Sequence, residues 1–207
     1  MGNCGYTPCM NPVLLRKTNI NRFTYDGMVT PAVVASIYDG DTMDVVFSRR
    51  GEHIRLVARM NGYDCPEKAP RKALTEDEKK EYSLPTLTKE EQDLAITIKC
   101  GLEKEAGRFV TEYIKKLIVE RVVRLECGKF DKYGRVLSDI YVRAPFCGQD
   151  IHINQHLIDR GYGKPYDGGK KTPFTLDDFR KIIGDFGGKI PVDVVNAEAR
   201  LNELRTE

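Results

Sequence analysis

Residues 32–60 read AVVASIYDGDTMDVVFSRRGEHIRLVARM, and this stretch decides the fold. Residues 32–37 form a run rich in β-branched side chains, and apolar residues then recur at every second position over 43–47 and over 54–60. Asp39-Gly40-Asp41, between the first two runs, has the composition of a hairpin turn. The stretch therefore predicts three consecutive strands. If the alternating apolar residues of the third strand point inward, Arg59 points outward, toward solvent or a cleft.

The rest of the chain supplies the other elements of a small barrel. Helical spacing begins at Leu102, and the further predicted elements are strands at Val122–Cys127 and Val136–Val142 and helices near Asn154–Arg160, Leu176–Ile183 and Val192–Leu204. Three strands, a helix, two strands and a helix is the order of a five-stranded Greek-key barrel of the OB type. We therefore predict a β-barrel with helices, of the α+β class.

The domain organisation follows from changes in composition along the chain. Residues 1–30 show little periodicity and are predicted to form an irregular N-terminal arm. The barrel domain is placed at 31–168 and includes a charged insertion at 68–99, which is expected to be solvated, part helix and part loop. Residues 169–207 are assigned to a helical C-terminal extension. We expect the segment 174–207 either to pack on the barrel or to bind a protein partner.

Composition limits the classes of partner and compartment. The 207 residues carry 33 Lys and Arg against 31 Asp and Glu, so a local patch would have to hold any anionic partner. No run of about 18 apolar residues is present, and no transmembrane helix is expected. The first residues lack the apolar run of a secretory signal, which favours an intracellular protein. Gly2 and Cys4 suggest an N-terminal lipid anchor, but Tyr6 stands where the acylation pattern has Ser or Thr, so lipidation is not favoured. The oligomeric state stays open.

Two acidic residues suit a hard divalent cation. Asp41 follows the predicted hairpin glycine, and Asp64 lies just after the third strand. Two carboxylates, a backbone carbonyl and waters make an all-oxygen shell, which Ca²⁺ or Mg²⁺ prefers over softer metals. We therefore predict one divalent cation, Ca²⁺ or alternatively Mg²⁺, shared by Asp41 and Asp64.

The remaining candidates suit an anionic phosphodiester. Arg59 and Arg135 carry planar forks that can each grip two phosphate oxygens. Glu67 follows Asp64 by three residues, across a proline, and from there it could orient or deprotonate an attacking water. Hydrolysis of a phosphodiester requires that the negative charge of the phosphate is neutralised, that the attacking water is deprotonated and that the transition state is stabilised. These residues together could meet all three requirements.

Three runs resemble the active-site runs of the staphylococcal nuclease (thermonuclease) family, in the same chain order and near the same spacing. They are Val34-x-x-Ile37-Tyr38-Asp39-Gly40-Asp41-Thr42, Arg59-(x4)-Asp64-Cys65-Pro66-Glu67 and Asp131-Lys132-Tyr133-Gly134-Arg135. The resemblance covers roughly residues 30–67 and 100–168. A looser likeness continues over Gly161-Tyr162-Gly163-Lys164-Pro165-Tyr166.

The resemblance implies a role for each matched residue. It makes Asp41 and Asp64 metal ligands, and it makes Arg59, Glu67 and Arg135 catalytic. It places Lys132 and Tyr133 against a substrate phosphate and Tyr166 against a nucleotide base. Cys65 stands where the family usually has threonine, and its backbone carbonyl can still reach the metal.

The implied activity is that of a Ca²⁺-dependent endonuclease that cleaves DNA and RNA and leaves 3′-phosphate ends. This chain departs from the family pattern in Cys65, in a longer loop between Asp41 and Arg59, and in the 68–99 insertion directly behind Glu67. One alternative is a catalytically weak or inactive nucleic-acid-binding OB-fold module. Another is a scaffold that recruits a protein through the insertion and the tail. The complete set of acids and arginines favours the nuclease.

Overall fold

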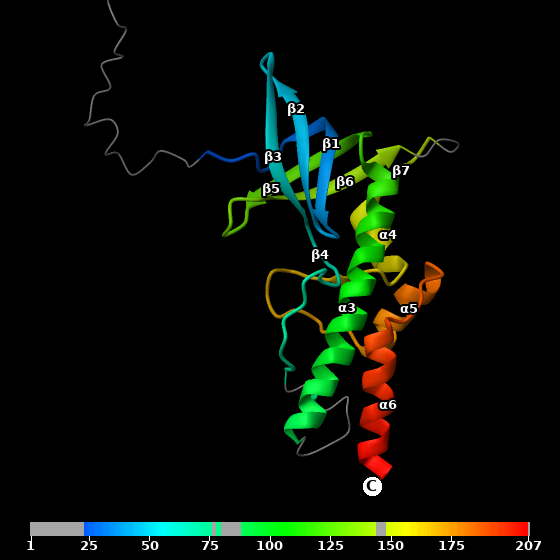
Figure 1. Ribbon diagram of the computed structural model, residues 1–207. Coiled ribbons are helices and arrows are strands. Elements are labelled where there is room, and N and C mark those ends of the chain that lie inside the picture. The colour runs from blue at the N-terminus through cyan, green and yellow to red at the C-terminus, as the bar shows by residue number, and fades with distance from the viewer. Residues whose placement is uncertain (1–22, 76–77, 80–87, 144–147, 207) are drawn as a thin grey trace, which may run out of the picture.

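The computed structural model describes residues 23–75, 78–79, 88–143 and 148–206. Figure 1 shows a β-barrel at one end of an elongated molecule and helices at the other. Gly2, Cys4 and Tyr6, which bear on the predicted lipid anchor, lie outside the described residues. No helix in the described ranges combines the length and the apolar character that crossing a membrane requires.

The barrel is built from two groups of strands. β1 (Val29–Asp39), β2 (Thr42–Arg49) and β3 (Glu52–Met60) form an antiparallel meander. β5 (Val122–Phe130) pairs antiparallel with β1 and with β6 (Val136–Arg143). β6 then runs parallel to β3, with Ala58 opposite Val136, and so closes the sheet. Within the described ranges these five strands form a closed mixed barrel, which confirms the predicted OB-type fold.

Short strands that the sequence did not predict add to the barrel. β7 (Asp150–His152) extends the sheet beyond β6. β4 (Tyr63–Asp64) pairs with β8 (Lys164–Pro165) in a separate two-stranded ladder. This ladder matters for the site because it places the segment after residue 161 directly beside Asp64.

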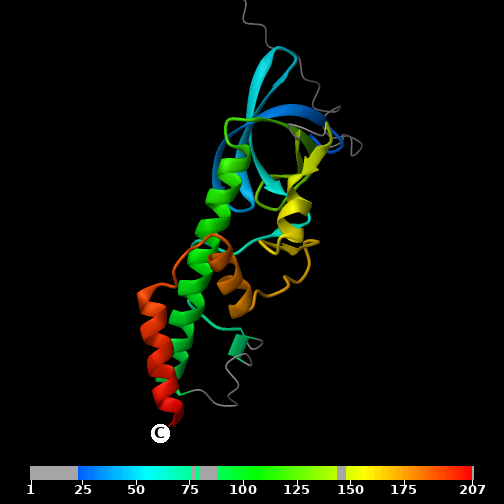
Figure 2. The same ribbon diagram turned by 90° about the vertical axis from the view of Figure 1, so that its right-hand side faces the viewer.

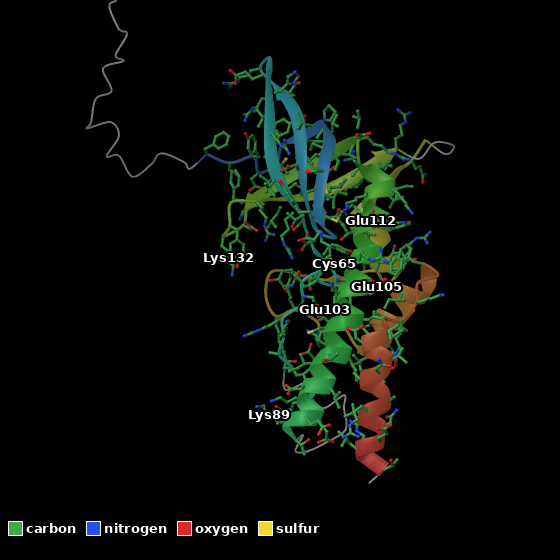
Figure 3. The ribbon with its side chains drawn as sticks, in the orientation of Figure 1. Cys65, Lys89, Glu103, Glu105, Glu112 and Lys132 are labelled. Carbon is green, nitrogen blue, oxygen red and sulfur yellow. The ribbon has the colours of Figure 1, made fainter. Side chains whose placement is uncertain are left out.

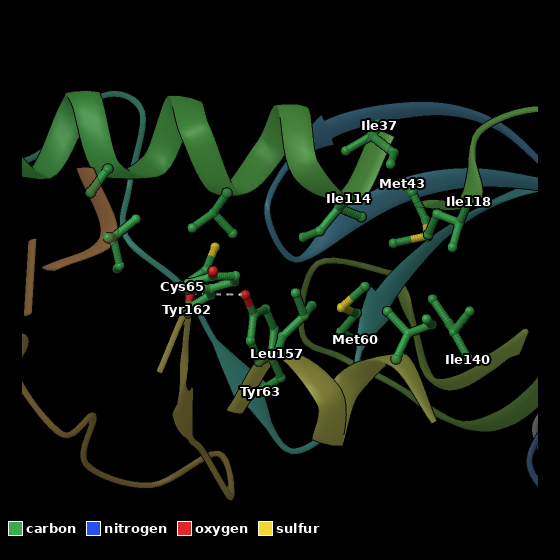
Figure 4. Packing of buried hydrophobic residues seen from close by; sticks show 14 of the residues in the cluster. Ile37, Met43, Met60, Tyr63, Cys65, Ile114, Ile118, Ile140, Leu157 and Tyr162 are labelled. Carbon is green, nitrogen blue, oxygen red and sulfur yellow. Dashed lines mark hydrogen bonds between the residues drawn. The ribbon is translucent and has the colours of Figure 1, made fainter. Parts of the chain in front are cut away.

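Helix α3 (Lys89–Ile118) corrects the prediction for the insertion. The helix does not start at Leu102 but at Lys89, where Thr88 and Glu91 form a capping box. Residues 89–99, predicted to be solvated, are therefore the first turns of α3, and Ala95 and Ile98 are fully buried. They continue the buried stripe of the later turns, which packs against the barrel. Figure 4 shows part of this packing, with Ile114 and Ile118 of α3 facing the barrel interior.

The C-terminal helices lie along α3. α4 (Ile153–Asp159) sits at the end of the barrel, as predicted, and α5 (Leu176–Asp185) and α6 (Val192–Thr206) follow it. Figure 2 shows α6 beside the first half of α3, and both α5 and α6 contact α3. Val194 of α6 packs so closely on Gly101 that a Cβ there would lie 2.3 Å from its side chain. The tail therefore packs mainly on α3, and it also contacts the segment after α4, where Lys164 pairs with Asp178.

The N-terminal arm ends earlier than predicted. β1 begins at Val29, so the last residues of the segment 1–30 already belong to the sheet. Just before β1, the ring of Tyr25 contacts the rings of Phe47 and Phe130.

Candidate active site

A cleft of about 580 Å³ lies where the barrel meets the loop that follows β8. Seven of the nine residues predicted for the site or the substrate line this cleft: Asp41, Arg59, Glu67, Lys132, Tyr133, Arg135 and Tyr166. Asp64 and Cys65 line an adjoining cavity of about 270 Å³, which shares Glu67 and Lys171 with the cleft. The fold therefore brings the three sequence runs to one place. Figure 3 shows two of their members, Lys132 at the tip of the β5–β6 hairpin and Cys65 close to α3.

The turn between β1 and β2 places Asp41 at the cleft. Gly40 allows this turn to pack tightly, because a Cβ there would lie 2.8 Å from the Cys65 sulfur and 3.2 Å from Val110 of α3. Burial raises the pKa of Asp41, while the adjacent Arg59 guanidinium and the Thr42 hydroxyl act to lower it. Asp41 is therefore a buried carboxylate that depends on neighbouring positive charge to stay ionised.

Arg59 joins the two predicted metal ligands. It lies near the end of β3, opposite Thr42 of β2, and its side chain faces the cleft as the alternation of the strand predicts. Its Nη2 lies 2.7 Å from Asp41 Oδ2 and 3.4 Å from Asp64 Oδ1. The two carboxylates therefore converge on a single guanidinium nitrogen, which marks the point that both can reach.

Lys171 is a site residue that the sequence did not single out. In the structure Lys171 Nζ lies 2.7 Å from Asp64 Oδ1 and 3.4 Å from Glu67 Oε1. Its only sequence signal is a basic pair after Gly168-Gly169, a few residues beyond Tyr166.

Glu67 lies at the edge of the cleft with about half of its side chain exposed. Helix α3 holds its backbone from behind. Glu103 Oε1 accepts a hydrogen bond from the Glu67 N–H at 3.4 Å, and Gly107 lies against the Pro66 and Glu67 carbonyls. A Cβ on Gly107 would lie only 2.6 Å from the Pro66 oxygen. The turn can therefore approach α3 this closely only because residue 107 is glycine.

Arg135 is oriented by the β5–β6 hairpin. Asp131 accepts hydrogen bonds from the backbone N–H groups of Tyr133 and Arg135 at 2.8 and 2.9 Å, and from Arg135 Nε at 2.7 Å. Burial opposes the ionisation of Asp131, but these hydrogen bonds outweigh it and lower its pKa. Arg135 Nη1 donates to Thr42 Oγ1 at 3.1 Å, and Thr42 Oγ1 donates to Asp41 Oδ1 at 2.6 Å. Thr42 therefore connects Arg135 to Asp41, and Asp131 orients Arg135, two functions that the sequence did not assign to them.

The predicted substrate-binding residues surround these groups. Tyr133 is 71% exposed at the hairpin tip, where the Lys132 ammonium and the Arg135 guanidinium lie 5.0 and 5.3 Å from its ring centre. The Arg59 guanidinium lies 5.6 Å from the ring centre of Tyr166. Two aromatic rings and several cations thus line one cleft, an arrangement that suits a strand of nucleotides.

Cys65 does not present its thiol to the cleft. The residue is buried, and Figure 4 shows it between α3 and Tyr162. Burial, together with the nearby carboxylates, raises the pKa of the thiol well above its usual range. The thiol therefore stays protonated at neutral pH and does not line the cleft. The backbone carbonyl, which the resemblance implies, stays a prediction.

The donors at this site fit a hard cation only in part. Asp41 and Asp64 supply oxygen atoms that converge on one point, which suits Ca²⁺ or Mg²⁺ completed by carbonyls and waters. Across the described residues, no group of three or more His, Cys, Asp or Glu side chains is arranged to hold a metal. Any cation would therefore rest on the two carboxylates, and it would compete for them with Arg59 and Lys171.

The fold and the cleft define a class: closed OB-type barrels in which paired acids and arginines face a nucleotide-sized groove. The family model described as "Staphylococcal nuclease homologue" matches residues 57–181, more than half of the chain. The protein belongs to this family of nucleases, as the sequence resemblance predicted. The match includes Arg59, Asp64 and Glu67 and the residues that follow them, whereas Asp41 lies before its first residue.

Two curated relatives agree with this family. Both carry the name "Uncharacterized endonuclease", one from Escherichia coli and one from Escherichia coli O157:H7. Each is 27% identical over 134 residues, which is 65% of this chain and 60% of the relative. The chain thus spans less than two thirds of the relatives that it matches.

Proposed function

We propose that the protein is a metal-dependent nuclease that hydrolyses phosphodiester bonds in DNA and RNA and leaves 3′-phosphate ends. The observation that carries the proposal is the convergence of Asp41, Asp64 and Arg59 on one point of a cleft that Arg135 also enters. The family supports the reaction class. The type of sugar, the product end and the use of Ca²⁺ rest on the resemblance.

Asp41 and Asp64 would hold the cation. When bound, this ion would supply positive charge to the scissile phosphate and to the attacking water. The Arg59 and Arg135 guanidinium groups would bind the phosphate oxygens, where their charge counts most as the transition state gains negative charge. Both arginines are oriented in advance, Arg59 by the two acids and Arg135 by Asp131.

Glu67 would accept a proton from the attacking water. Its half-exposed carboxylate is accessible at the rim of the cleft, and its backbone is fixed by α3. As the water oxygen attacks phosphorus, the bond from phosphorus to the 5′ oxygen breaks. The phosphate stays on the 3′ oxygen, and the 5′ oxygen takes up a proton from solvent and leaves as a hydroxyl group. Lys132, Tyr133 and Tyr166 would bind the neighbouring phosphate and base, which fixes the geometry of attack.

The test uses the full chain with single-stranded DNA and RNA oligonucleotides in Ca²⁺, in Mg²⁺ and in chelator. We expect cleavage that chelator abolishes, with products that a polymerase extends only after phosphatase treatment. Glu67→Gln should lower turnover more than it lowers cation affinity. A collapse of cation affinity in that variant would instead make Glu67 a ligand. Absence of chelator-sensitive cleavage with any of several divalent ions would overturn the proposal.

One observation favours a second candidate, a nucleic-acid-binding module without turnover. Arg59 and Lys171 already neutralise the two acids that the cation would need. Retention of oligonucleotide binding without cleavage in any divalent ion would support this reading. A protein partner for segment 174–207 and an intracellular location stay predictions.

A further inference from the structure

Lys171 contacts a carboxylate oxygen that a cation held by Asp41 and Asp64 would use. Its ammonium nitrogen is 2.7 Å from Asp64 Oδ1, and the same oxygen lies 3.4 Å from Arg59 Nη2. Ca²⁺ binds carboxylate oxygens at about 2.3–2.6 Å. An ammonium and a divalent ion on the same carboxylate oxygen carry like charges at close range and repel each other. Binding of the ion at Asp64 Oδ1 therefore disfavours the contact with Lys171.

Charge compensation explains the contact between Lys171 and Asp64. The side chain of Asp64 is 7% exposed, and a buried carboxylate is costly unless positive charge compensates it. Lys171 supplies part of this charge, and it also lies 3.4 Å from Glu67 Oε1. The lysine itself is 48% exposed, so its ammonium can leave Asp64 for water without becoming a buried, unpaired charge.

The loop that carries Lys171 is held at both ends by contacts outside the acidic site. At its start, the Tyr166 N–H donates to the Gly62 carbonyl at 3.0 Å. At its end, Lys164 Nζ donates to the Pro173 carbonyl at 2.7 Å. Figure 1 shows this loop, in gold, between β8 and α5. Release of Lys171 would therefore free the middle of the loop while its ends stay in place.

We propose that Lys171 is a built-in counter-ion of the cation site, displaced from Asp64 and Glu67 when a divalent cation binds. This inference rests on the proposed function, because it takes Asp64 as a ligand. Lys171 thereby lowers the affinity for the cation, and cation binding is coupled to release of the loop that begins at Tyr166. Lys171 is a positioning residue in this scheme, since it acts through the acids and the loop.

The first measurement is the affinity for Ca²⁺ alone, by calorimetry on the full chain without substrate. Lys171→Met should bind Ca²⁺ about three- to tenfold more tightly than the unmodified protein, a modest factor because water screens a half-exposed ammonium. Lys170→Met is the matched control: it removes the same charge from the neighbouring position of the same loop, where the side chain lines the adjoining cavity beside Asp64 but not the cleft. It should change the affinity by less than twofold. Asp64→Asn should abolish the tight site in either background.

The second measurement is hydrogen exchange of residues 166–173 with and without Ca²⁺. Saturating Ca²⁺ should speed exchange in the unmodified protein and in Lys170→Met. In Lys171→Met, exchange should be fast at the outset and should not respond to Ca²⁺. Lys171→Gln, which keeps a polar end, should behave as Lys171→Met does and guards against a packing effect of methionine.

The outcomes separate this inference from the proposed function. If cleavage is normal but Lys171→Met binds Ca²⁺ no more tightly than Lys170→Met, the counter-ion role is wrong and the nuclease stands. If no cleavage occurs but Ca²⁺ binding and loop exchange behave as expected, the counter-ion role stands and the nuclease falls. If the unmodified protein and every variant bind neither Ca²⁺ nor Mg²⁺, the inference is overturned.

Discussion

Replacing Gly107 with alanine should damage the active-site turn, because Gly107 lies on the face of α3 that contacts this turn. Within a helix, alanine is favoured over glycine by about 1 kcal/mol, so the change alone would stabilise the protein. The added Cβ, however, would lie 2.6 Å from the Pro66 oxygen and 3.0 Å from the Glu67 oxygen, both backbone atoms. Ordinary contact begins at 3.4 Å, so the turn or the helix must move by about 0.8 Å, the difference between 3.4 and 2.6 Å.

Two magnitudes follow from this displacement. Overpacking typically costs about 1–3 kcal/mol, which leaves Gly107→Ala about 0–2 kcal/mol less stable after the helical gain. A misplacement near 1 Å at a catalytic group can cost about 100-fold in rate. Because Glu67 moves with its backbone, we expect turnover to fall by about 10- to 100-fold, a larger relative effect than the loss of stability.

The matched control is Gly184→Ala in α5. Gly184 is exposed, and a Cβ there would meet nothing within 4 Å. This variant should gain up to about 1 kcal/mol and keep its turnover. Urea unfolding and oligonucleotide cleavage measure both variants. The reasoning is refuted if Gly107→Ala matches Gly184→Ala in unfolding midpoint and also retains full turnover.

Three further changes probe other parts of the molecule. Arg135→Lys keeps the positive charge but loses the planar guanidinium that can bind two phosphate oxygens, so turnover should fall at least about tenfold. The control Arg143→Lys, at the far end of β6, should leave turnover unchanged. Equal cleavage rates for the two variants would contradict the role of Arg135. Asn154→Ala removes a buried amide that bonds three backbone groups, and should cost about 2–4 kcal/mol in urea unfolding; a loss below 1 kcal/mol would show that water replaces it. Burial opposes ionisation of Asp44, but hydrogen bonds, foremost that from Arg55, outweigh burial and lower the Asp44 pKa. The ionised Asp44 therefore stabilises the folded protein above the unfolded pKa near 3.9, and this contribution is lost as the pH falls through the lower folded pKa. Asp44→Asn should therefore lose less stability than the unmodified protein between about pH 4 and pH 2, and parallel acid curves would count against this prediction.

The barrel was predictable because its strands are long enough to show alternation. Residues 54–60 alternate, and that pattern also predicted that Arg59 would face a cleft. The pairing of β4 with β8 could not be predicted, since a strand of two residues has no period. The start of α3 was recoverable in principle: Thr88 and Glu91 form a capping box, but the charged residues around Ala95 obscured the apolar stripe.

The sequence predicted which residues form the candidate site, but it did not predict how their side chains are oriented. Residue type and spacing indicated the acids and the arginines, because those groups suit a cation and a phosphate. Spacing does not say which way a side chain turns, so the buried thiol of Cys65 came only from the structure. Lys171 depends on the path of a loop without periodicity, and nothing in the local sequence determines that path.

The insertion supports the active-site turn instead of standing apart from it. Its last residue, Lys99, lies within α3, and Lys99 Nζ lies 2.8 Å from Glu103 Oε2 and 3.3 Å from Glu78 Oε1. The other oxygen of Glu103 accepts the Glu67 N–H. Burying such charges has a desolvation cost that their attraction need not recover, so the network is weak as a source of stability. The network instead fixes the position of the Glu67 turn. Lys99 orients Glu103, Glu103 holds the Glu67 backbone, and Gly107 allows that backbone to lie close to α3. Charged residues of the insertion, which the sequence predicted to be solvated, thus help to position Glu67, the group proposed to activate water.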